Sequence, residues 1–258
     1  TIYLTYEWIS TRWKHFNRNC TLNIVVIEKY DKIIGIFPLM RKTCSLLFLK
    51  FQTLETIGAA NCNNVGLFKP ENEQEVIKAF SNYIAEEILS KRQIVRLELV
   101  PEDCRFQELF LKNMDCLCDR AVYNKKYFTS APFIPINTDW NSYFNSLSSN
   151  RRKKMREIIN RSKRKYNVEY GKFTQDKLDF ALERLFEIHT QRWHSSNIRS
   201  PFIYLENRYF YRDIADEFNK NGWLHFSFIK IDGEISSITF SFIFNKKFYF
   251  ATTARKLE

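Results

Sequence analysis

The segment from residue 151 to residue 165 gathers the side chains best suited to hold an anion. It contains nine Lys or Arg residues and a single Glu, which accounts for +8 of the chain's net charge of +11. At 100° per residue, Arg152, Arg156 and Lys163 share one side of the helix that this segment predicts. Guanidinium groups hold phosphates through paired hydrogen bonds, so the segment predicts a surface that binds phosphate groups.

The alternative for this segment is an ordinary solvated helix face. We include Asn150 and Arg151, which begin the segment, among the candidate substrate- or anion-binding residues. Because the charge excess is confined to one helix, an anionic partner such as a phosphorylated molecule or an RNA would bind here. The apolar side of the helix is expected to face the protein core and consists of Met155, Ile158, Ile159 and Ser162.

A second set of reactive side chains is the run His189-Thr190-Gln191-Arg192-Trp193. His189 falls on the apolar stripe of a predicted helix, four residues after Leu185. A histidine with a pKa near its usual ~6.5 can act as a general base towards an amine. The alternative is a partly buried histidine that a main-chain carbonyl satisfies. Arg192 could anchor a carboxylate or a phosphate while it stacks on the ring of Trp193.

Composition and missing motifs narrow the function classes. The chain is 45% hydrophobic and 27% charged, which is typical of a globular protein. Its apolar runs fall short of the roughly 18 residues of a membrane span, and its first residues do not resemble a secretory signal, which predicts a cytoplasmic protein. The six cysteines form no CxxC pair, so no metal site is expected. GxSxG, P-loop, GxGxxG and HExxH motifs are absent, which argues against hydrolases, nucleotide triphosphatases, dinucleotide enzymes and zinc proteases.

Periodicity in the second half of the chain predicts the elements that would position these side chains. Asp139 is placed to cap a short helix, and the basic helix follows. The helix that carries His189 and a helix over residues 210–218 come next. Three strands then close the chain, with the turn Asp232-Gly233 as a strong hairpin signal. The strands are expected at 223–231, 234–244 and 248–253.

The first half of the chain predicts a similar order of elements. A helix ending near Phe16 precedes a hairpin over residues 22–40, which turns at Tyr30-Asp31-Lys32. The remaining elements are a strand at 48–57, a helix at 73–89, a strand at 94–100, a helix from a cap at Asp103 to Met114, and extended structure at 121–136.

The two halves predict a duplicated unit that consists of a helix followed by a strand meander. Residues 22–39 and 224–241 share the order strand, tight turn, strand, with Gly35 and the pair Ser236-Ser237 at matching places. Pro132 and Pro135 interrupt regular pairing and mark a linker. We therefore predict an α/β (α+β) protein with domains at 1–130 and 131–258.

Several stretches, taken together and in order, resemble the CelD/BcsL family of acetyltransferases, which is related to the FemAB-like branch of the GNAT fold. The stretches are Thr5-Tyr6-Glu7-Trp8-Ile9, Ile33-Ile34-Gly35-Ile36-Phe37-Pro38-Leu39-Met40, Leu147-Ser148-Ser149-Asn150-Arg151-Arg152 with Arg156, His189-Thr190-Gln191-Arg192-Trp193, and Trp223-Leu224. They run across nearly the whole chain.

The resemblance implies two tandem GNAT-like units, each a mixed, mostly antiparallel sheet flanked by helices. It also implies acetyl-CoA or another acyl-CoA as the donor, whose phosphates the basic helix could bind. In a GNAT site, the last strand of the meander guides the pantetheine arm, and the acceptor sits beside it. Tyr249 and Thr252 lie on this strand, which makes Tyr249 a candidate to protonate the leaving thiolate and Thr252 a candidate substrate contact. The alternative for Tyr249 is packing within the sheet.

The resemblance also predicts that the second unit is incomplete at its C-terminus. A GNAT phosphate loop follows the meander and opens a helix, and this sequence ends where that loop would begin. In the first unit, residues 55–60 occupy the corresponding place, but Glu55 would repel a pyrophosphate. The first unit is therefore expected to be structural or to bind the acceptor.

These observations predict an acyl-CoA-dependent N- or O-acyltransferase with His189 and Tyr249 as catalytic residues. Its acceptor would be a small molecule or one related to the cell envelope or to polysaccharides. Two alternatives stay open. One is a FemAB-like transferase that takes an aminoacyl group from a tRNA, and the other is a non-catalytic module that binds an anionic polymer or nucleic acid through residues 151–165.

Overall fold

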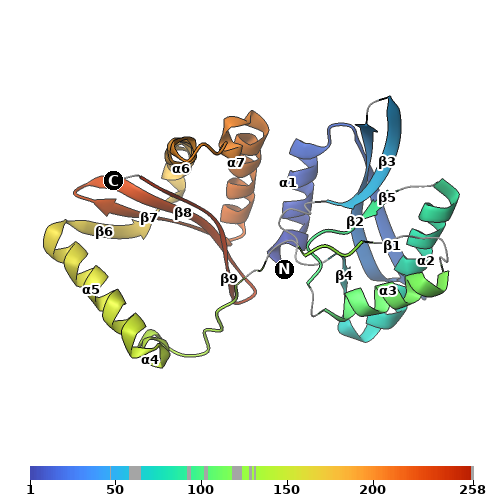
Figure 1. Ribbon diagram of the computed structural model, residues 1–258, viewed down its shortest axis with the longest axis horizontal. Helices are drawn as coiled ribbons and strands as arrows, with labels where there is room; N and C mark the ends of the chain where they lie inside the picture. Colours follow the sequence, from blue (N-terminus) through green and yellow to red (C-terminus); the bar gives the residue numbers. More distant parts are fainter. Residues whose placement is uncertain are drawn as a thin grey trace. The chain divides into compact units, whose positions relative to one another are not determined.

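A computed structural model describes residues 1–46, 48–57, 65–91, 94–101, 104–117, 124–127, 130 and 132–256. The chain divides into two compact units, Thr1–Tyr127 and Phe128–Glu258, called the first and second units below (Figure 1). Each has a sheet of its own. That both units are GNAT-like stays a prediction.

The first unit is a mixed sheet with helices against it. The strands follow the order β1-β2-β3-β5, with β4 paired to β2; β3 and β5 run parallel and the other pairs are antiparallel. The elements are α1 (Tyr6–Phe16), β1 (Cys20–Lys29), β2 (Lys32–Leu46), β3 (Leu49–Thr56), β4 (Leu67–Phe68), α2 (Glu73–Lys91), β5 (Ile94–Arg96) and α3 (Arg105–Leu117).

The core of the first unit lies between its sheet and the helices α2 and α3. Phe37 on β2 stacks on Phe80 of α2 with ring centroids 3.8 Å apart, and both side chains are fully buried. A Cβ at Gly35 would lie 2.7 Å from Cγ1 of Val76. The glycine therefore allows α2 to approach β2 closely.

The second unit has an antiparallel sheet in the order β6-β7-β8-β9. Helices α6 and α7 pack on one face of this sheet, and Figure 1 shows α5 on the other side. The elements are α4 (Trp140–Ser146), α5 (Ser149–Lys165), β6 (Val168–Lys172), α6 (Leu178–Ser195), α7 (Leu205–Lys220), β7 (Leu224–Ile231), β8 (Glu234–Phe244) and β9 (Lys247–Arg255).

The hairpins β1–β2 and β7–β8 have the same turn and the same irregularity. Both turns have two residues with positive φ, Tyr30-Asp31 and Asp232-Gly233, as type I′ hairpins require. In both hairpins, the third residue of the second strand is bulged and has no partner in the strand register. In the first unit this residue is Ile34, which lies between the pairs Glu28–Ile33 and Ile27–Gly35. In the second unit it is Ser236, which lies between the pairs Lys230–Ile235 and Ile229–Ser237. Counting from the turn therefore gives equivalent residues in the two units.

One expectation from the sequence needs correction here, one strand was missed, and one expected cap is not tested. The described part of residues 121–136 forms no strand, because prolines and polar residues leave it without a partner strand. Strand β6 was not predicted, since its residues do not alternate clearly in hydrophobicity. The proposed cap at Asp103 lies outside the described residues.

The predicted inner face of the basic helix is also wrong. No residue of α5 is buried, and Ile158 and Ile159 are 47% and 44% exposed. Periodicity correctly indicated an apolar stripe, but it could not indicate whether anything packs against it.

Candidate functional site

Strand β9 forms one edge of the second sheet and is bulged in its middle. Phe240 on β8 pairs with Thr252, whereas the next residue, Ser241, pairs with Phe250, so Ala251 is an extra residue in β9. Among the described residues, β9 pairs only with β8. Its outer edge can therefore offer main-chain N–H and C=O groups to a ligand.

Two predicted residues, Tyr249 and Thr252, lie on β9 on either side of this bulge. The Thr252 hydroxyl is 2.6 Å from the hydroxyl of Tyr211 on α7. Tyr249 pairs with Phe242 in the strand register and is partly buried. The hydrogen bond between Thr252 and Tyr211 thus connects β9 to α7 beside the bulge. Thr252 is the member of this pair that the sequence predicted.

His189 is buried within α6 and belongs to an aromatic cluster. Its ring stacks on Trp193 at 5.3 Å and meets the edge of Phe202 at 4.9 Å. Phe202 contacts Tyr211, so the cluster extends from His189 to the Tyr211–Thr252 pair. The fold therefore brings together three of the predicted residues, His189, Trp193 and Thr252, on the helix-covered side of the sheet.

Hydrogen bonding fixes the tautomer of His189. Ser200 Oγ accepts from the Phe202 N–H at 3.1 Å and from the Thr190 hydroxyl at 3.4 Å. Its one proton is left for Nδ1 of His189, 2.8 Å away. Nδ1 is then the acceptor and Nε2 carries the proton, so the neutral ring offers a donor and not a free lone pair.

Burial, and secondarily the charge of Arg192, lower the pKa of His189 to about 4. The ring is therefore neutral at pH 7. A neutral ring locked as the Nε2–H tautomer suits a structural position better than the general-base role suggested by the sequence. Arg192 itself is half-buried in the last turn of α6.

The basic helix α5 is joined to the short helix α4 by two of the predicted arginines. Arg152 Nη1 donates to the carbonyl oxygen of Asn145 at 2.8 Å and also to that of Leu147. Arg156 lies over the ring of Phe144, 5.1 Å from its centroid. Cations at the C-terminal end of a helix are stabilised by its carbonyl groups, so Arg152 has a local structural role that the sequence did not reveal.

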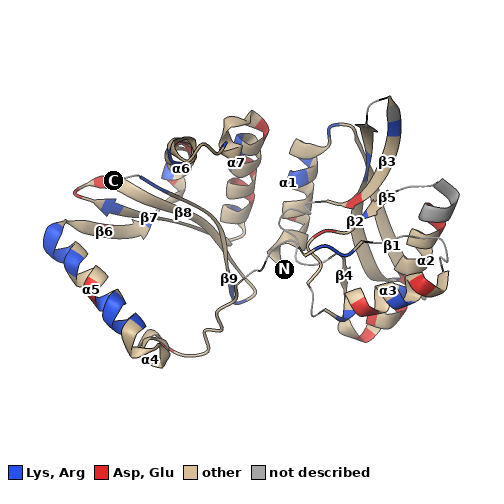
Figure 2. Ribbon diagram, viewed as in Figure 1, with Lys and Arg blue, Asp and Glu red and all other residues tan. Residues whose placement is uncertain are grey.

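The other charges of α5 point to solvent. Figure 2 shows basic residues along both halves of the helix, separated near its middle by an acidic residue and uncharged residues. Asn150 and Arg151 are exposed at its N-terminal end. The remaining exposed Lys and Arg residues are Lys153, Lys154, Arg161, Lys163, Arg164 and Lys165. The sequence-predicted residues thus fall into two groups, one on α5 and one on α6 and β9.

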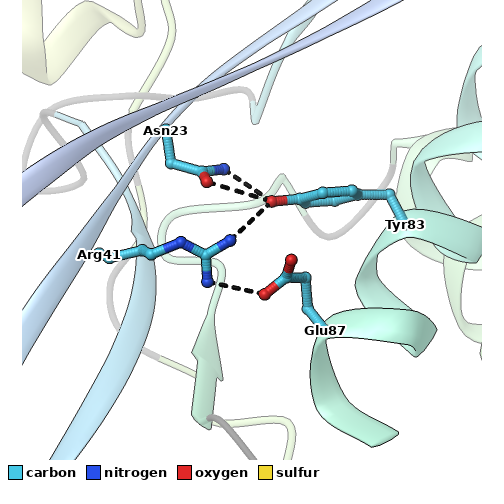
Figure 3. A network of polar contacts seen from close by, with 4 residues as sticks. All are labelled: Asn23, Arg41, Tyr83 and Glu87. Atoms are coloured by element: carbon cyan, nitrogen blue, oxygen red, sulfur yellow. Dashed lines mark hydrogen bonds and ion pairs between the residues drawn. The ribbon is translucent and has the colours of Figure 1, made fainter. Parts of the chain in front are cut away.

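In the first unit, four polar side chains form a largely buried network between the sheet and α2. Figure 3 shows Arg41 of β2 between Glu87 and Tyr83 of α2, with Asn23 of β1 beside the tyrosine. Arg41 Nη1 lies 2.7 Å from Glu87 Oε2, and Arg41 Nη2 donates to the Tyr83 hydroxyl at 3.2 Å. Asn23 Nδ2 donates to the same hydroxyl at 2.8 Å. The hydrogen bond to Glu87 raises the pKa of Arg41, so the network is an ion pair that ties α2 to the sheet.

Sequence reasoning missed Tyr211, Ser200, His225 and Ser241. Tyr211 and Ser200 gave no signal, because their partners are distant in sequence or on a different element. His225 did give a signal in the sequence, because it precedes Phe226 in a strand and must therefore face the opposite side of the sheet. In the part of the chain that the structure describes, no three His, Cys, Asp or Glu residues could hold a metal ion.

Comparisons with known proteins agree with this architecture. Residues 149–256 match the family described as Acetyltransferase (GNAT) domain. Among solved structures, the chain is similar to FemX at 11% identity and a TM-score of 0.63, over 100% of this chain and 76% of FemX. It is also similar to a conserved protein of unknown function from Bacteroides thetaiotaomicron VPI-5482, at 14% identity and a TM-score of 0.55, over 98% and 71% of the two chains. No curated protein gives a significant match.

At such identities, the likeness to the solved structures concerns the fold. The predicted fold class is confirmed: the protein is a mixed α/β chain with two sheets, its second unit matches a GNAT domain, and the chain is similar in fold to FemX. The specific resemblance to CelD/BcsL stays a prediction. No helix in the described residues combines the length and apolar character needed to cross a membrane.

Proposed function

We propose that the protein is a GNAT-type acyltransferase that uses acetyl-CoA or another acyl-CoA as donor. The observation that carries the proposal is the bulged edge strand β9, which lies inside the segment that matches the acetyltransferase domain. A strand edge of this kind offers main-chain N–H groups to the thioester carbonyl and to the pantetheine arm. The acceptor is an amine or a hydroxyl, and the resemblance to CelD/BcsL favours a small or envelope-related molecule.

The proposed reaction is a direct attack of the acceptor on the thioester carbonyl. Binding both substrates beside β9 lowers the entropic cost of their encounter. Tyr249, on the strand just before the bulge, protonates the departing thiolate. Thr252 contacts the substrate from a position that Tyr211 fixes. No covalent intermediate on the enzyme is needed.

Thermal-shift titration of the full chain tests the donor. A ligand that binds only the folded state stabilises it by about 2.7 kcal/mol at a hundred times its dissociation constant. We expect stabilisation by acetyl-CoA or a longer acyl-CoA, together with release of free thiol when an acceptor amine is present. Free CoA is the matched control for the acyl group. If no CoA thioester stabilised the protein, the proposal that it uses an acyl-CoA donor would be rejected.

The second candidate is a FemAB-like transferase that uses an aminoacyl-tRNA. The observation that favours it is helix α5, whose basic side chains are exposed and none of whose residues is buried. Such a surface suits a nucleic-acid backbone, whose binding weakens steeply with salt. Salt-dependent binding of tRNA without any CoA effect would favour this candidate. If no transfer accompanied that binding, a non-catalytic nucleic-acid module would be the better description.

We also propose that the two units are copies of one fold. The support is the pair of hairpins with the same I′ turn and the same bulge position. In this proposal, the first unit has lost its donor site, and Arg41, Glu87 and Tyr83 now hold its sheet to α2. Residues 58–60 of the suggested phosphate-like loop lie outside the described residues.

A further inference from the structure

The bulge of β9 decides which face of the sheet its side chains occupy. Residues that pair across antiparallel strands have side chains on the same face. Tyr249 pairs with Phe242, whose ring contacts α7. Thr252 pairs with Phe240, whose ring also contacts α7. In a regular strand, residues three apart lie on opposite faces, so it is the extra residue Ala251 that brings Tyr249 and Thr252 to the same one.

Tyr211 of α7 meets β9 on this face, immediately after the bulge. Its hydroxyl oxygen is 2.6 Å from the hydroxyl oxygen of Thr252, the residue that follows Ala251. A hydrogen bond joins the two residues whichever oxygen donates. A side chain of α7 is therefore bound to the residue at which the register of β9 shifts.

Aromatic rings fix the position of the Tyr211 side chain. Four rings surround it at centroid distances between 4.8 and 6.4 Å, and they belong to Phe186, Phe202, Phe210 and Phe240. Three of these contacts are edge-to-face, which is a favourable arrangement for aromatic pairs. Rings packed in this way have little freedom to rotate. The Tyr211 hydroxyl is therefore held in place by the core of the second unit, and Thr252 is held by the hydroxyl.

The backbone at the bulge is less constrained by the sheet than its neighbours are. Ala251 has no partner in the register with β8, and its side chain is exposed. The residue after it, Thr252, returns to the register opposite Phe240. Because a bulged residue is left out of the ladder, a side-chain bond at the next residue limits the movement of the main chain there.

We infer that Tyr211 is a positioning residue for the acyl transfer and that it acts through Thr252 on the bulge of β9. The inference rests on the proposed function, in which main-chain N–H groups of this strand meet the thioester carbonyl. Such groups stabilise the negative charge that develops on the carbonyl oxygen only if they are already aimed at it. Tyr211 maintains that aim, and it neither touches the thioester nor exchanges a proton with it.

The same bond maintains the position of the proposed acid. A strand that slips by one residue turns its side chains to the opposite face. If the bulge moved along β9, Tyr249 and Thr252 would no longer share a face. By holding Thr252 in its register, Tyr211 keeps Tyr249 on the side of the strand where the hydroxyl pair lies.

The rigidity of the bulge can be measured without a substrate. In nitrogen-15 relaxation of the full chain, the N–H groups of Ala251 and Thr252 should have order parameters near ~0.85. Tyr211→Phe removes the hydroxyl and keeps the ring, and it should lower these order parameters towards ~0.6. Tyr209→Phe, which removes an exposed hydroxyl from the same helix, is the matched control. Order parameters that Tyr211→Phe leaves unchanged would overturn the inference.

Turnover separates positioning from a merely structural role, with acetyl-CoA as donor, ethanolamine as acceptor probe and free thiol as readout. Tyr211→Phe should lower kcat about 10- to 100-fold with little change in KM for acetyl-CoA, because the loss is confined to the transition state. Tyr209→Phe should keep both constants. A Tyr211→Phe variant that unfolds at a lower temperature but keeps its kcat while folded would show a structural role only.

A double-variant cycle tests whether Tyr211 acts through Thr252. Thr252→Val keeps the shape of the side chain and loses the hydroxyl, so it should lower kcat at least as much as Tyr211→Phe. Thr252→Ser, which keeps a hydroxyl, should lose less. Tyr211→Phe/Thr252→Val should match Thr252→Val within about twofold, because the bond is already broken. Losses that multiply would mean that the two hydroxyls act independently, against the inference.

Failure of this inference and failure of the proposed function look different. An unmodified protein that neither binds acetyl-CoA nor releases thiol rejects the acyl-CoA function, and the positioning role falls with it. An active protein whose Tyr211→Phe variant keeps its kcat rejects only the positioning role. Where the unmodified protein binds acetyl-CoA but does not acylate ethanolamine, the order parameters of the bulge decide.

Discussion

Beneath α2 in the first unit, Phe37, Leu39 and Leu54 are fully buried, whereas in the second unit their equivalents are Thr239, Ser241 and Phe248, the last of them 52% exposed. The backbones of the two hairpins have the same turn and bulge. The difference therefore comes from the side chains. Those at equivalent positions lie on the same face of the hairpin in both units, but they are more polar in the second unit. A shared backbone can thus carry apolar core side chains in one unit and hydroxyl side chains at equivalent positions in the other.

The largest effect on stability is expected when a core residue of the first unit is replaced by the equivalent residue of the second unit. Leu39→Ser places a hydroxyl and a cavity in a fully buried site and is expected to cost about 3–5 kcal/mol in the free energy of unfolding. The reciprocal control, Ser227→Val in the second unit, should change stability by less than about 1 kcal/mol. Chemical denaturation followed by circular dichroism measures both. Similar costs for the two variants would show that both faces are packed alike.

The second largest loss of stability is expected when the polar network of the first unit is disrupted. Glu87→Ala leaves the Arg41 guanidinium, largely buried, without its carboxylate, and should destabilise the protein by about 3 kcal/mol. Ile243 occupies the position equivalent to Arg41 in the second unit. The double variant Arg41→Ile/Glu87→Leu, which introduces that apolar solution, should recover most of the loss in the same denaturation assay. A double variant no better than Glu87→Ala would mean that the ion pair itself is needed to hold α2 on the sheet.

The strands, helices and tight turn of the meander were predictable because local signals fix them. Alternating hydrophobicity and Asp232-Gly233 predicted β7 and β8, and Asp139 was correctly identified as a cap, since it accepts from the N–H groups of Asn141 and Ser142. Strand β6 was missed because its polar and apolar residues carry no clear period.

The site was less predictable because its chemistry depends on partners distant in sequence. A histidine in an apolar stripe looks the same whether a serine hydroxyl donates to it or accepts from it. Ser200 reaches His189 through the turn after α6, and Ser241 reaches His225 across a strand pair. Only the fold shows these two pairs, and only the fold shows that no residue of α5 is buried.

The buried His189 of the second unit adds a pH-dependent test. The pKa of His189 is lowered to about 4 in the folded state, so its contribution to stability is complete above the unfolded value of ~6.5 and is lost as pH falls towards 4. Between pH 7 and pH 5 the loss should be about 2 kcal/mol. Denaturation of His189→Gln at the two pH values should show a loss smaller by that amount. An unchanged pH dependence would place the His189 ring in water.

The smallest expected effect concerns α5 and tests whether its apolar stripe is exposed. Ile158 and Ile159 are nearly half exposed, so Ile158→Ser/Ile159→Ser should change the free energy of unfolding by less than about 0.5 kcal/mol. Leu185→Ala in α6, on the covered side, is the matched control and should cost about 2–5 kcal/mol. A cost above about 2 kcal/mol for the α5 variant would mean that its apolar stripe is buried against another surface.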